Sequence, residues 1–388
     1  MTTAGIATLV SALLAAGIFI IHVAVAVGAV ITLFLQRSLE RRAARSVAAA
    51  GAARVTVSVV VPAKNEQFSL PRLLSSLEEQ DTDDFEIVLV NDRSTDDTAR
   101  VMEEFRTRLG DRVVVVTVTE AQPEGNPKQH ALAHGARAAS GDVLLLTDAD
   151  CVVPPSWVRR STGYFGDPRL GLVFGPVYPK GTDGWLTHYQ SFDHVFRYYY
   201  TAGSAGLSNA TGGFGNNLAV RVEALTAVGG FQGLRHSATE DAELISEVRD
   251  TKQWLIRAHI NRGATVHPEP QRTLGALFKQ ELRWHIGALF SPDWATRVSF
   301  GVVMLFLFVS VLAAPLAFWF PPILLLAAGS FSSMVLMAVV AGAFSKREPV
   351  YWLLLIPNVV FSMLFYSLTT LRTLLPVKIS WKGTTLRR

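Results

Sequence analysis

The stretch Val55–Glu66, which reads VTVSVVVPAKNE, decides the fold of this chain. Its first seven residues form a mostly β-branched run with the length of a buried strand, and the residues from Pro62 onward end that run. Ser69 then precedes Pro71 and an amphipathic segment with the start signals of a helix, whose apolar positions are Leu70, Leu73, Leu74 and Leu77. A buried strand that leads into an amphipathic helix predicts an α/β domain.

The alternation of strand and helix continues along the first half of this domain. Further strands are predicted at Phe85–Val90, Arg112–Val118 and Val143–Thr147. Ser94 and Asp97 have the spacing of a capping box, which predicts a helix from there to about Leu109, and a third helix is predicted at Pro127–Ala139. Such alternation predicts a mostly parallel sheet with right-handed crossovers, and ligands of such sheets bind beyond the carboxyl ends of the strands.

The second half of the domain is less regular. No strand is predicted there, and helices are predicted near Gly184–Tyr200, Val222–Val228, Glu240–Asp250 and Leu274–Leu289. The last of these lies within residues 273–290 and is expected at the membrane interface. The α/β domain is expected to span residues 55–296.

Long apolar segments flank the domain, and 49% of all residues are hydrophobic. Ala4–Leu35 has no charged residue, Val298–Phe344 has none and is broken at Pro321-Pro322, and Val350–Leu371 carries Pro357. Each piece is long enough to cross a bilayer. The expected organisation is an N-terminal anchor at 1–36, a basic linker at 37–54, three membrane helices within 297–375 and a basic tail at 376–388.

The arginines that follow the first segment favour the cytoplasmic side, so a retained anchor is expected rather than a cleaved signal peptide. We therefore expect a multi-pass protein of the cell (inner) membrane with its catalytic domain in the cytoplasm. The lone cysteine, Cys151, suits a reducing compartment, and no aromatic and basic interleaving indicates nucleic-acid binding. Three full C-terminal spans would leave the basic tail outside, which conflicts with its charge. The segment with Pro357 therefore either spans the membrane, so that the basic tail lies outside against the positive-inside rule, or is re-entrant or interfacial.

Carboxylates follow the predicted strands. Asp148 and Asp150 form a D-x-D pair after the fourth strand, and such oxygen ligands suit Mg²⁺ or Mn²⁺ while leaving positions for phosphate. Asp92 follows the second strand and could accept hydrogen bonds from a base or ribose. An acidic turn is common, so the D-x-D alone is weak, and Asp92 could simply be a turn residue.

Other polar residues are expected near the same edge of the sheet. Glu66 could line the cleft and Lys128 could meet a phosphate, although solvent-exposed side chains would explain both. Glu240 and Asp241 begin a helix, where the dipole keeps a carboxylate ionised, so Asp241 suits a proton acceptor only if burial offsets that effect. Ordinary helix capping is the alternative.

The segment Gln280–Trp284 reads QELRW, and Gln280, Arg283 and Trp284 share one helix face. Arginine can pair with a diphosphate through two parallel hydrogen bonds, and an indole can stack on a sugar ring. An amphipathic helix at the membrane interface is the alternative. The loop Gly212–Asn217 could shape the mouth of an acceptor site.

Together these motifs resemble those of family 2 glycosyltransferases with a GT-A (Rossmann-like) fold, in their membrane-bound Q-x-x-R-W branch. The resemblance covers about residues 55–284. It implies an inverting enzyme that uses a UDP-sugar and a divalent metal. It also implies roles for the following residues: donor binding by Pro62, Glu66, Asp92, Lys128 and Asp148; metal binding by Asp148 and Asp150; general base catalysis by Asp241; diphosphate or acceptor contact by Glu240, Gln280, Arg283 and Trp284.

One departure concerns the family's usual DDGS after the second strand, which reads Asn91-Asp92-Arg93-Ser94 here and leaves the donor less certain than the fold. Relatives that glycosylate ceramide, hopanoids or carotenoids have a similar layout, which favours a single transfer to a lipid-like acceptor. A processive polysaccharide synthase is the alternative, but so few spans with almost no polar residues suit a sugar channel poorly. A non-catalytic nucleotide-sugar sensor is the alternative of another class.

Overall fold

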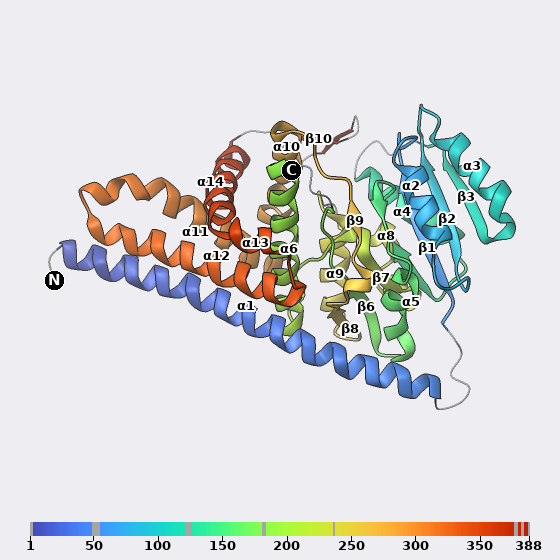
Figure 1. Cartoon of the computed structure of the whole chain (residues 1–388), viewed down its shortest axis with the longest axis horizontal. Coiled ribbons are helices and arrows are strands. Elements are labelled where there is room, and N and C mark those ends of the chain that lie inside the picture. Colours follow the sequence, from blue (N-terminus) through green and yellow to red (C-terminus); the bar gives the residue numbers. More distant parts are fainter. Residues whose placement is uncertain are drawn as a thin grey trace.

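The computed structural model describes residues 3–48, 55–120, 126–180, 184–235, 237–375, 379–381 and 384–386. The molecule is elongated (Figure 1): an α/β domain occupies one end, and long helices extend from it to the other. The membrane segments predicted from the sequence and the α/β domain are thus parts of one elongated structure.

A seven-stranded sheet forms the centre of the domain, in the order β3-β2-β1-β4-β7-β6-β8. Only β7 runs against its neighbours β4 and β6, so the sheet is mostly parallel, as predicted. The strands are β1 (Val57–Ala63), β2 (Glu86–Asp92), β3 (Val113–Val118), β4 (Val143–Leu146), β6 (Leu170–Phe174), β7 (Leu218–Arg221) and β8 (Leu255–Ala258). Two-stranded pairs join β5 (Cys151–Val152) to β9 (His267–Pro268), and β10 (Ile379–Trp381) to β11 (Thr384–Leu386).

Helices cover both faces of this sheet. Along β1, Val59 and Val61 face the core formed with α2 and α3, whereas Val60 faces the core that contains α4. This alternation is the period of two that a strand imposes on its side chains. The helices of the α/β domain are α2 (Leu70–Glu78), α3 (Thr98–Leu109), α4 (Pro127–Ala138), α5 (Trp157–Thr162), α6 (Gly184–Gly206), α7 (Val222–Ala227), α8 (Gly230–Gly233), α9 (Glu240–Asp250) and α10 (Leu274–Leu289).

The predicted capping box was wrong. Helix α3 begins at Thr98, and Asp96 accepts hydrogen bonds from the backbone of Thr98 and of Gln67 instead. Asn65 in turn accepts one from the backbone of Thr95, at 2.8 Å. The polar side chains thus join two loops at the carboxyl edge of the sheet, because both loops meet there in three dimensions.

The helices outside the domain are α1 (Thr3–Ala48), α11 (Trp294–Ala313), α12 (Leu324–Ser345), α13 (Pro349–Leu353) and α14 (Leu355–Leu374). In the described chain four helical segments are long and apolar enough to cross a membrane: Gly5–Arg42, Trp294–Phe318, Pro321–Ser345 and Leu355–Leu374. The last begins at Leu355 rather than at Val350, so Pro357 lies in its first turn. Proline is tolerated in a first turn because the backbone N–H there has no helical partner.

Helix α1 is continuous through the predicted anchor boundary at residue 36, and its second half packs on the α/β domain. The hydroxyl of Thr32 donates to the carbonyl of Ala202 at 2.7 Å, and Gln36 accepts from the backbone of Ile260 at 2.6 Å. A Cβ on Gly28 would collide with the carbonyl of Gly203, so only glycine permits this close crossing of α1 and α6. The helix therefore links the apolar end of the molecule rigidly to the domain.

Candidate active site

A cavity of about 500 Å³ lies at the carboxyl edge of the sheet. All eleven residues predicted to form the site line it: Pro62, Glu66, Asp92, Lys128, Asp148, Asp150, Glu240, Asp241, Gln280, Arg283 and Trp284. They come from strand ends, loops and helices far apart in sequence. The structure thus brings together every residue of the prediction, while the role of each stays a prediction.

Lys128 occupies the charged centre of the cavity. Its Nζ lies 2.6 Å from Asp148 and 3.1 Å from Glu240. Asn126 caps α4 by accepting from the backbone of Lys128, and its amide donates to Glu240 at 2.9 Å. Burial lowers the pKa of Lys128, but the surrounding carboxylates outweigh burial, so its pKa is raised overall and the ammonium stays charged. Lys128 is thus a charged lysine fixed by two ion pairs inside the cavity, and the alternative of a solvent-exposed lysine is wrong.

Asp241 follows Glu240 at the start of α9 and lies beside the ion pair of Lys128 and Glu240. One oxygen accepts from the backbone of Gly215 at 2.8 Å, and the other from the backbone of Ala242 at 2.8 Å. Burial, followed by the charge of Glu240, raises the pKa of Asp241 to about 6, although Lys128 and these two hydrogen bonds act in the opposite direction. Burial therefore does offset the helix dipole here, which was the condition for a proton acceptor.

Glu240 has the opposite environment within the same helix turn. Burial acts to raise its pKa, but Lys128 outweighs burial, and the pKa of Glu240 is lowered overall. Two adjacent carboxylates therefore have pKa values pushed apart, which is typical of sites that divide charge stabilisation and proton transfer between neighbouring groups.

Asp92 ends β2 and is buried, and Arg93 pairs with its Oδ1 at 2.6 Å. Arg93 has a positive φ of 55°, which turns the chain sharply after the strand. The sequence analysis noted Arg93 only as a departure from the usual motif. The pairing shows that the arginine holds the carboxylate at the cavity edge.

Asp148 and Asp150 flank Ala149 between β4 and β5, and both line the cavity. In the described part of the chain no cluster of three or more His, Cys, Asp or Glu residues forms a complete metal cage. Two carboxylates nevertheless fit Mg²⁺ or Mn²⁺, which take oxygen ligands and commonly complete their shell with phosphate and water. A cation at this site would thus be shared between the chain and a phosphorylated ligand.

Helix α10 presents Gln280, Arg283 and Trp284 to the cavity, as predicted. The guanidinium of Arg197, on α6, lies 5.2 Å from the centroid of the Trp284 ring. This places one cation against the indole. Arg197 was not predicted from the sequence, although Asp193 stands four residues before it at the spacing of a helical ion pair.

Arg197 belongs to a buried polar network beneath Trp284. It pairs with Asp193 at 2.8 Å and with Glu281, and the hydroxyl of Tyr366 donates to Asp193. Buried charges of this kind require their partners, since removing one partner costs about 3–5 kcal/mol. The network therefore fixes Trp284 relative to α6 and α14.

The end of the cavity that lies away from Lys128 and the carboxylates is uncharged. Its walls are the loop 211–216 and residues of α6 and α11, among them Thr201, Thr296, Phe300 and Met304. The predicted loop Gly212–Asn217 therefore does line the cavity through most of its length. A Cβ at Gly213 would lie 2.8 Å from the Cδ1 atom of Ile245 and 3.0 Å from the ring of Phe174, so a larger residue there would require these side chains to shift.

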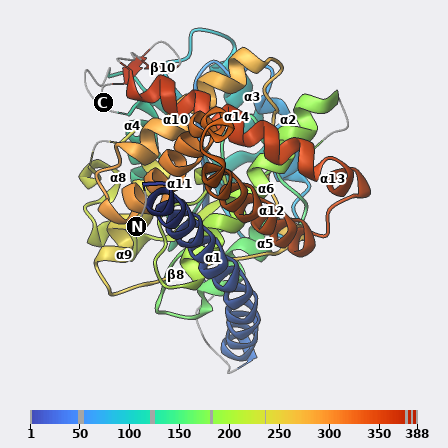
Figure 2. The ribbon, with the colours of Figure 1, turned by 90° about the vertical axis from the view of Figure 1, so that its left-hand side faces the viewer.

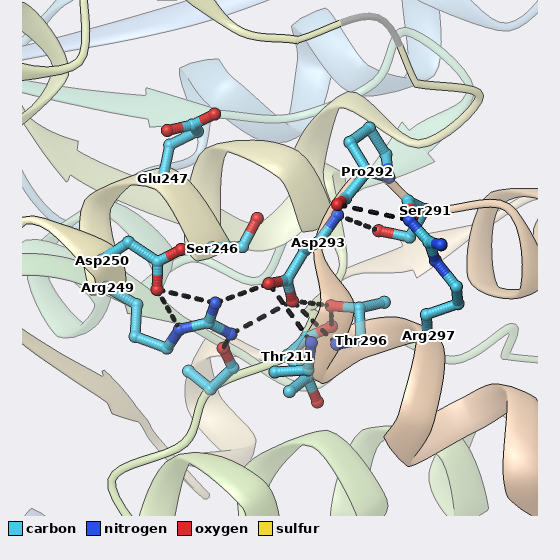
Figure 3. Close-up of polar contacts among 12 residues, drawn as sticks. Thr211, Ser246, Glu247, Arg249, Asp250, Ser291, Pro292, Asp293, Thr296 and Arg297 are labelled. Carbon is cyan, nitrogen blue, oxygen red and sulfur yellow. Dashed lines mark hydrogen bonds and ion pairs between the residues drawn. The ribbon is translucent and has the colours of Figure 1, made fainter.

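Figure 3 shows the polar joint that holds this end to the domain. Asp293 caps α11 by accepting from the backbone and hydroxyl of Thr296, and it pairs with Arg249 of α9 at 2.7 Å. The Thr296 hydroxyl also reaches the carbonyl of Thr211 at 2.9 Å, and Arg249 reaches that of Ala210 at 3.0 Å. The start of α11 is thus tied to α9, the helix that carries Asp241.

The fold, with its polar cavity at the carboxyl edge of the sheet, is similar to that of known glycosyltransferases. Residues 58–241 match the model of glycosyl transferase family 2, so this part of the chain is similar to the glycosyltransferase domains of that family. The mannosyltransferase PcManGT of Pyrobaculum calidifontis, solved in complex with GDP-Man and Mn²⁺, has a similar structure. The likeness covers 92% of this chain and 99% of that one at 17% identity and a TM-score of 0.50, and it shows a shared fold.

Curated relatives support the same family. The chain is 28% identical over 239 residues to a β-monoglucosyldiacylglycerol synthase of Synechocystis, which is 60% of this chain and 47% of that protein. It is 38% identical over 140 residues to an undecaprenyl-phosphate 4-deoxy-4-formamido-L-arabinose transferase of Pseudomonas fluorescens, covering 35% of this chain and 39% of that protein. The chain thus spans less than half the length of these relatives.

Proposed function

We propose that the chain is a membrane-bound, inverting glycosyltransferase that moves one sugar from a UDP-sugar to a hydroxyl of a lipid-like acceptor. The observation that carries the proposal is the course of the cavity. It runs from the carboxylates at Asp148 and Asp241 to Phe300 and Met304 of α11, a candidate membrane span. A charged donor at one end and an apolar acceptor at the other would meet near Asp241.

In this mechanism Asp241 accepts the proton of the acceptor hydroxyl. The oxygen then forms a bond to the anomeric carbon of the sugar, and the bond to the diphosphate breaks with its electron pair leaving on the diphosphate. Lys128 and Arg283 lie in the same cavity and supply positive charge toward that leaving group. Asp148 and Asp150 would hold Mg²⁺ or Mn²⁺, which neutralises diphosphate charge when bound.

A lipid acceptor suits the names of the two curated relatives, which are a diacylglycerol glycolipid synthase and a transferase to undecaprenyl phosphate. A processive synthase would need a path for polymer between its spans. Among the described residues that line the cavity, α11 is the only candidate span represented, and α1, α12 and α14 contribute none. This distribution favours a single transfer over extrusion of a polymer.

A nucleotide-sugar sensor would need the donor end of the cavity but not a proton acceptor. The raised pKa of Asp241, produced by burial and by Glu240, suits proton transfer near neutral pH and favours an enzyme over a sensor. The same four apolar helices and the arginines after the first favour a multi-pass protein of the cell (inner) membrane with a cytoplasmic catalytic domain.

The test uses the purified protein in detergent with Mn²⁺ and a panel of UDP- and GDP-sugars. Release of nucleoside diphosphate is measured with and without an added membrane lipid extract. We expect release that requires the extract and is lost in Asp241→Asn, whereas Asp97→Asn, a change at an exposed carboxylate of α3's start, keeps it. Release by Asp241→Asn equal to that of the unchanged protein would contradict the proposal.

A further inference from the structure

We propose that α14 lies along the membrane surface on the catalytic side instead of crossing the bilayer. The chain then has three spans, α1, α11 and α12, and its basic tail follows on the same side as the catalytic domain. The partner of the outward face of α14 is the boundary between head groups and acyl chains of that leaflet. The inference concerns topology and does not depend on the reaction proposed above.

The first observation is that the middle of α14 packs against α6. Phe361 contacts Trp185 with ring centroids 4.8 Å apart, and Ser362 donates to the hydroxyl of Tyr189 at 3.3 Å. Farther along both helices, Tyr366 donates to Asp193 and lies against Arg197 with 4.8 Å between the guanidinium and the ring. On α14 these contacts fall between Phe361 and Tyr366, in the middle of the helix, whereas on α6 they extend from Trp185 to Arg197, so α14 crosses α6 there.

The second observation is that α6 cannot lie in hydrocarbon. It lines the charged cavity through Gln190, His194, Arg197 and Thr201, which occupy its central turns. It also carries the ion pair of Asp193 with Arg197. A helix in the bilayer would have to desolvate these groups at a cost of several kcal/mol each. The middle of α14, which contacts these residues of α6, therefore lies at the same depth, outside the hydrocarbon core.

The third observation is the direction of α14 in space. In Figure 1, α1, α11 and α12 run along the long axis of the molecule, whereas α14 runs across that axis near α10. Figure 2 looks along the long axis and shows α14 stretched across the view. If the three long helices cross the bilayer, α14 therefore lies nearly in its plane.

The two faces of α14 suit such a position. Its polar side chains are buried against the protein: Asn358, Ser362, Tyr366, Thr369 and Thr373. Thr369 shares a hydrogen bond of 3.1 Å with His285 of α10, the helix that carries the Q-x-x-R-W motif. The exposed face is a single apolar stripe, Ile356, Val360, Leu364, Leu368, Leu371 and Leu374. This stripe is a surface for the apolar edge of a leaflet.

The arrangement also removes the conflict between the basic charge of the tail and a location outside the cell. The tail contains Lys378, Lys382, Arg387 and Arg388, and three spans instead of four place it on the cytoplasmic side. The N-terminus and the connection between α11 and α12 lie together at the far end of the molecule, on the other side (Figure 1).

The experiment introduces one cysteine at a time and labels it with a membrane-impermeant maleimide in sealed membrane vesicles. The background is the unchanged chain, because Cys151 is buried. Lys346→Cys lies between α12 and α13, Thr2→Cys lies before α1, and these two report the two sides whatever the orientation of the vesicle. We expect Leu375→Cys, at the exposed end of α14, to label from the same side as Lys346→Cys. Labelling from the side of Thr2→Cys would overturn the proposal.

A depth measurement keeps the proposal testable if a cysteine at 375 is poorly reactive. Nitroxide probes are placed at Ile356, Leu364 and Leu371, and their exposure to lipid-soluble oxygen is compared with that to a polar relaxation agent. Equal depths at all three positions are expected. Positions 356 and 371 are about 22 Å apart along a helix, so a spanning α14 would show depths that change stepwise by that amount, and this result would overturn the proposal.

Discussion

The two ends of the cavity differ in how their properties arise. The donor end is charged, and its groups follow strands or begin helices, so that Asp148, Lys128 and Glu240 meet where the sheet ends. The acceptor end is uncharged and is formed where α6 and α11 approach each other, with Thr201 and Met304 on different helices. Under the proposed function, the sheet edge supplies the chemistry and the junction with the membrane helices selects the acceptor.

The largest effect is expected at Asp241, where the two ends meet. Asp241→Asn keeps the size of the side chain but removes the proton acceptor, so kcat should fall by about 10²–10⁴-fold. Donor affinity should stay within about threefold, because the base acts mainly in the transition state. Single-turnover kinetics and calorimetric titration of the donor measure the two quantities. A loss of donor affinity with turnover preserved would assign Asp241 to the donor end instead.

The next effect tests the donor end alone. Lys128→Met removes the cation between Asp148 and Glu240, and a hydrogen bond to a charged group contributes about 1.5–3 kcal/mol. Donor affinity should fall about ten- to a hundredfold and acceptor KM should stay unchanged. Lys252→Met, at an exposed lysine, is the control and should alter neither value. An equal loss in both variants would separate Lys128 from the donor.

The next largest effect is expected in the pH dependence of kcat. Because the pKa of Asp241 is raised to about 6 by burial and by Glu240, the carboxylate is ionised above that pH and protonated below it. The value of kcat should therefore rise with pH up to about 6, and it should fall about tenfold for each unit below. Donor affinity over the same range serves as the reference. A flat kcat between pH 5 and 7, with chemistry rate-limiting, would exclude a base with this pKa.

The smallest effect tests the acceptor end. Met304 is buried and lines the cavity, whereas Leu305 next to it is exposed on the outer side of α11. Met304→Ala should raise acceptor KM about fivefold, which corresponds to roughly 1 kcal/mol of lost apolar contact. Leu305→Ala should leave it unchanged, and donor affinity should be the same in both. Equal effects of the two substitutions would mean that the acceptor does not occupy this end.

The same two ends differ in what the sequence predicts. Strands β1 to β4 and helices α2, α4, α9 and α10 are predicted within a few residues, because their periodicity and start signals are local. The residues of the donor end follow these elements directly. The amino-acid sequence is therefore enough to assign them to one cavity.

The acceptor end has no comparable local signal. Strands β6, β7 and β8 have only four or five residues each and were missed. The network of Asp193, Arg197, Glu281 and Tyr366 joins three helices, and its members are up to 173 residues apart. The direction of α14 likewise depends on its packing against α10 and α11, which composition does not encode. Tertiary contacts decide all of these features.

The most direct test of the central claim is the product made by membranes that contain this protein. The membranes are incubated with Mn²⁺ and a radiolabelled nucleotide sugar, then partitioned between organic solvent and water, and the labelled product is analysed by mass spectrometry. A single added sugar on an organic-soluble product, absent with Asp241→Asn, is the predicted result. Label in high-mass aqueous polymer would contradict single transfer to a lipid-like acceptor and would identify a processive synthase.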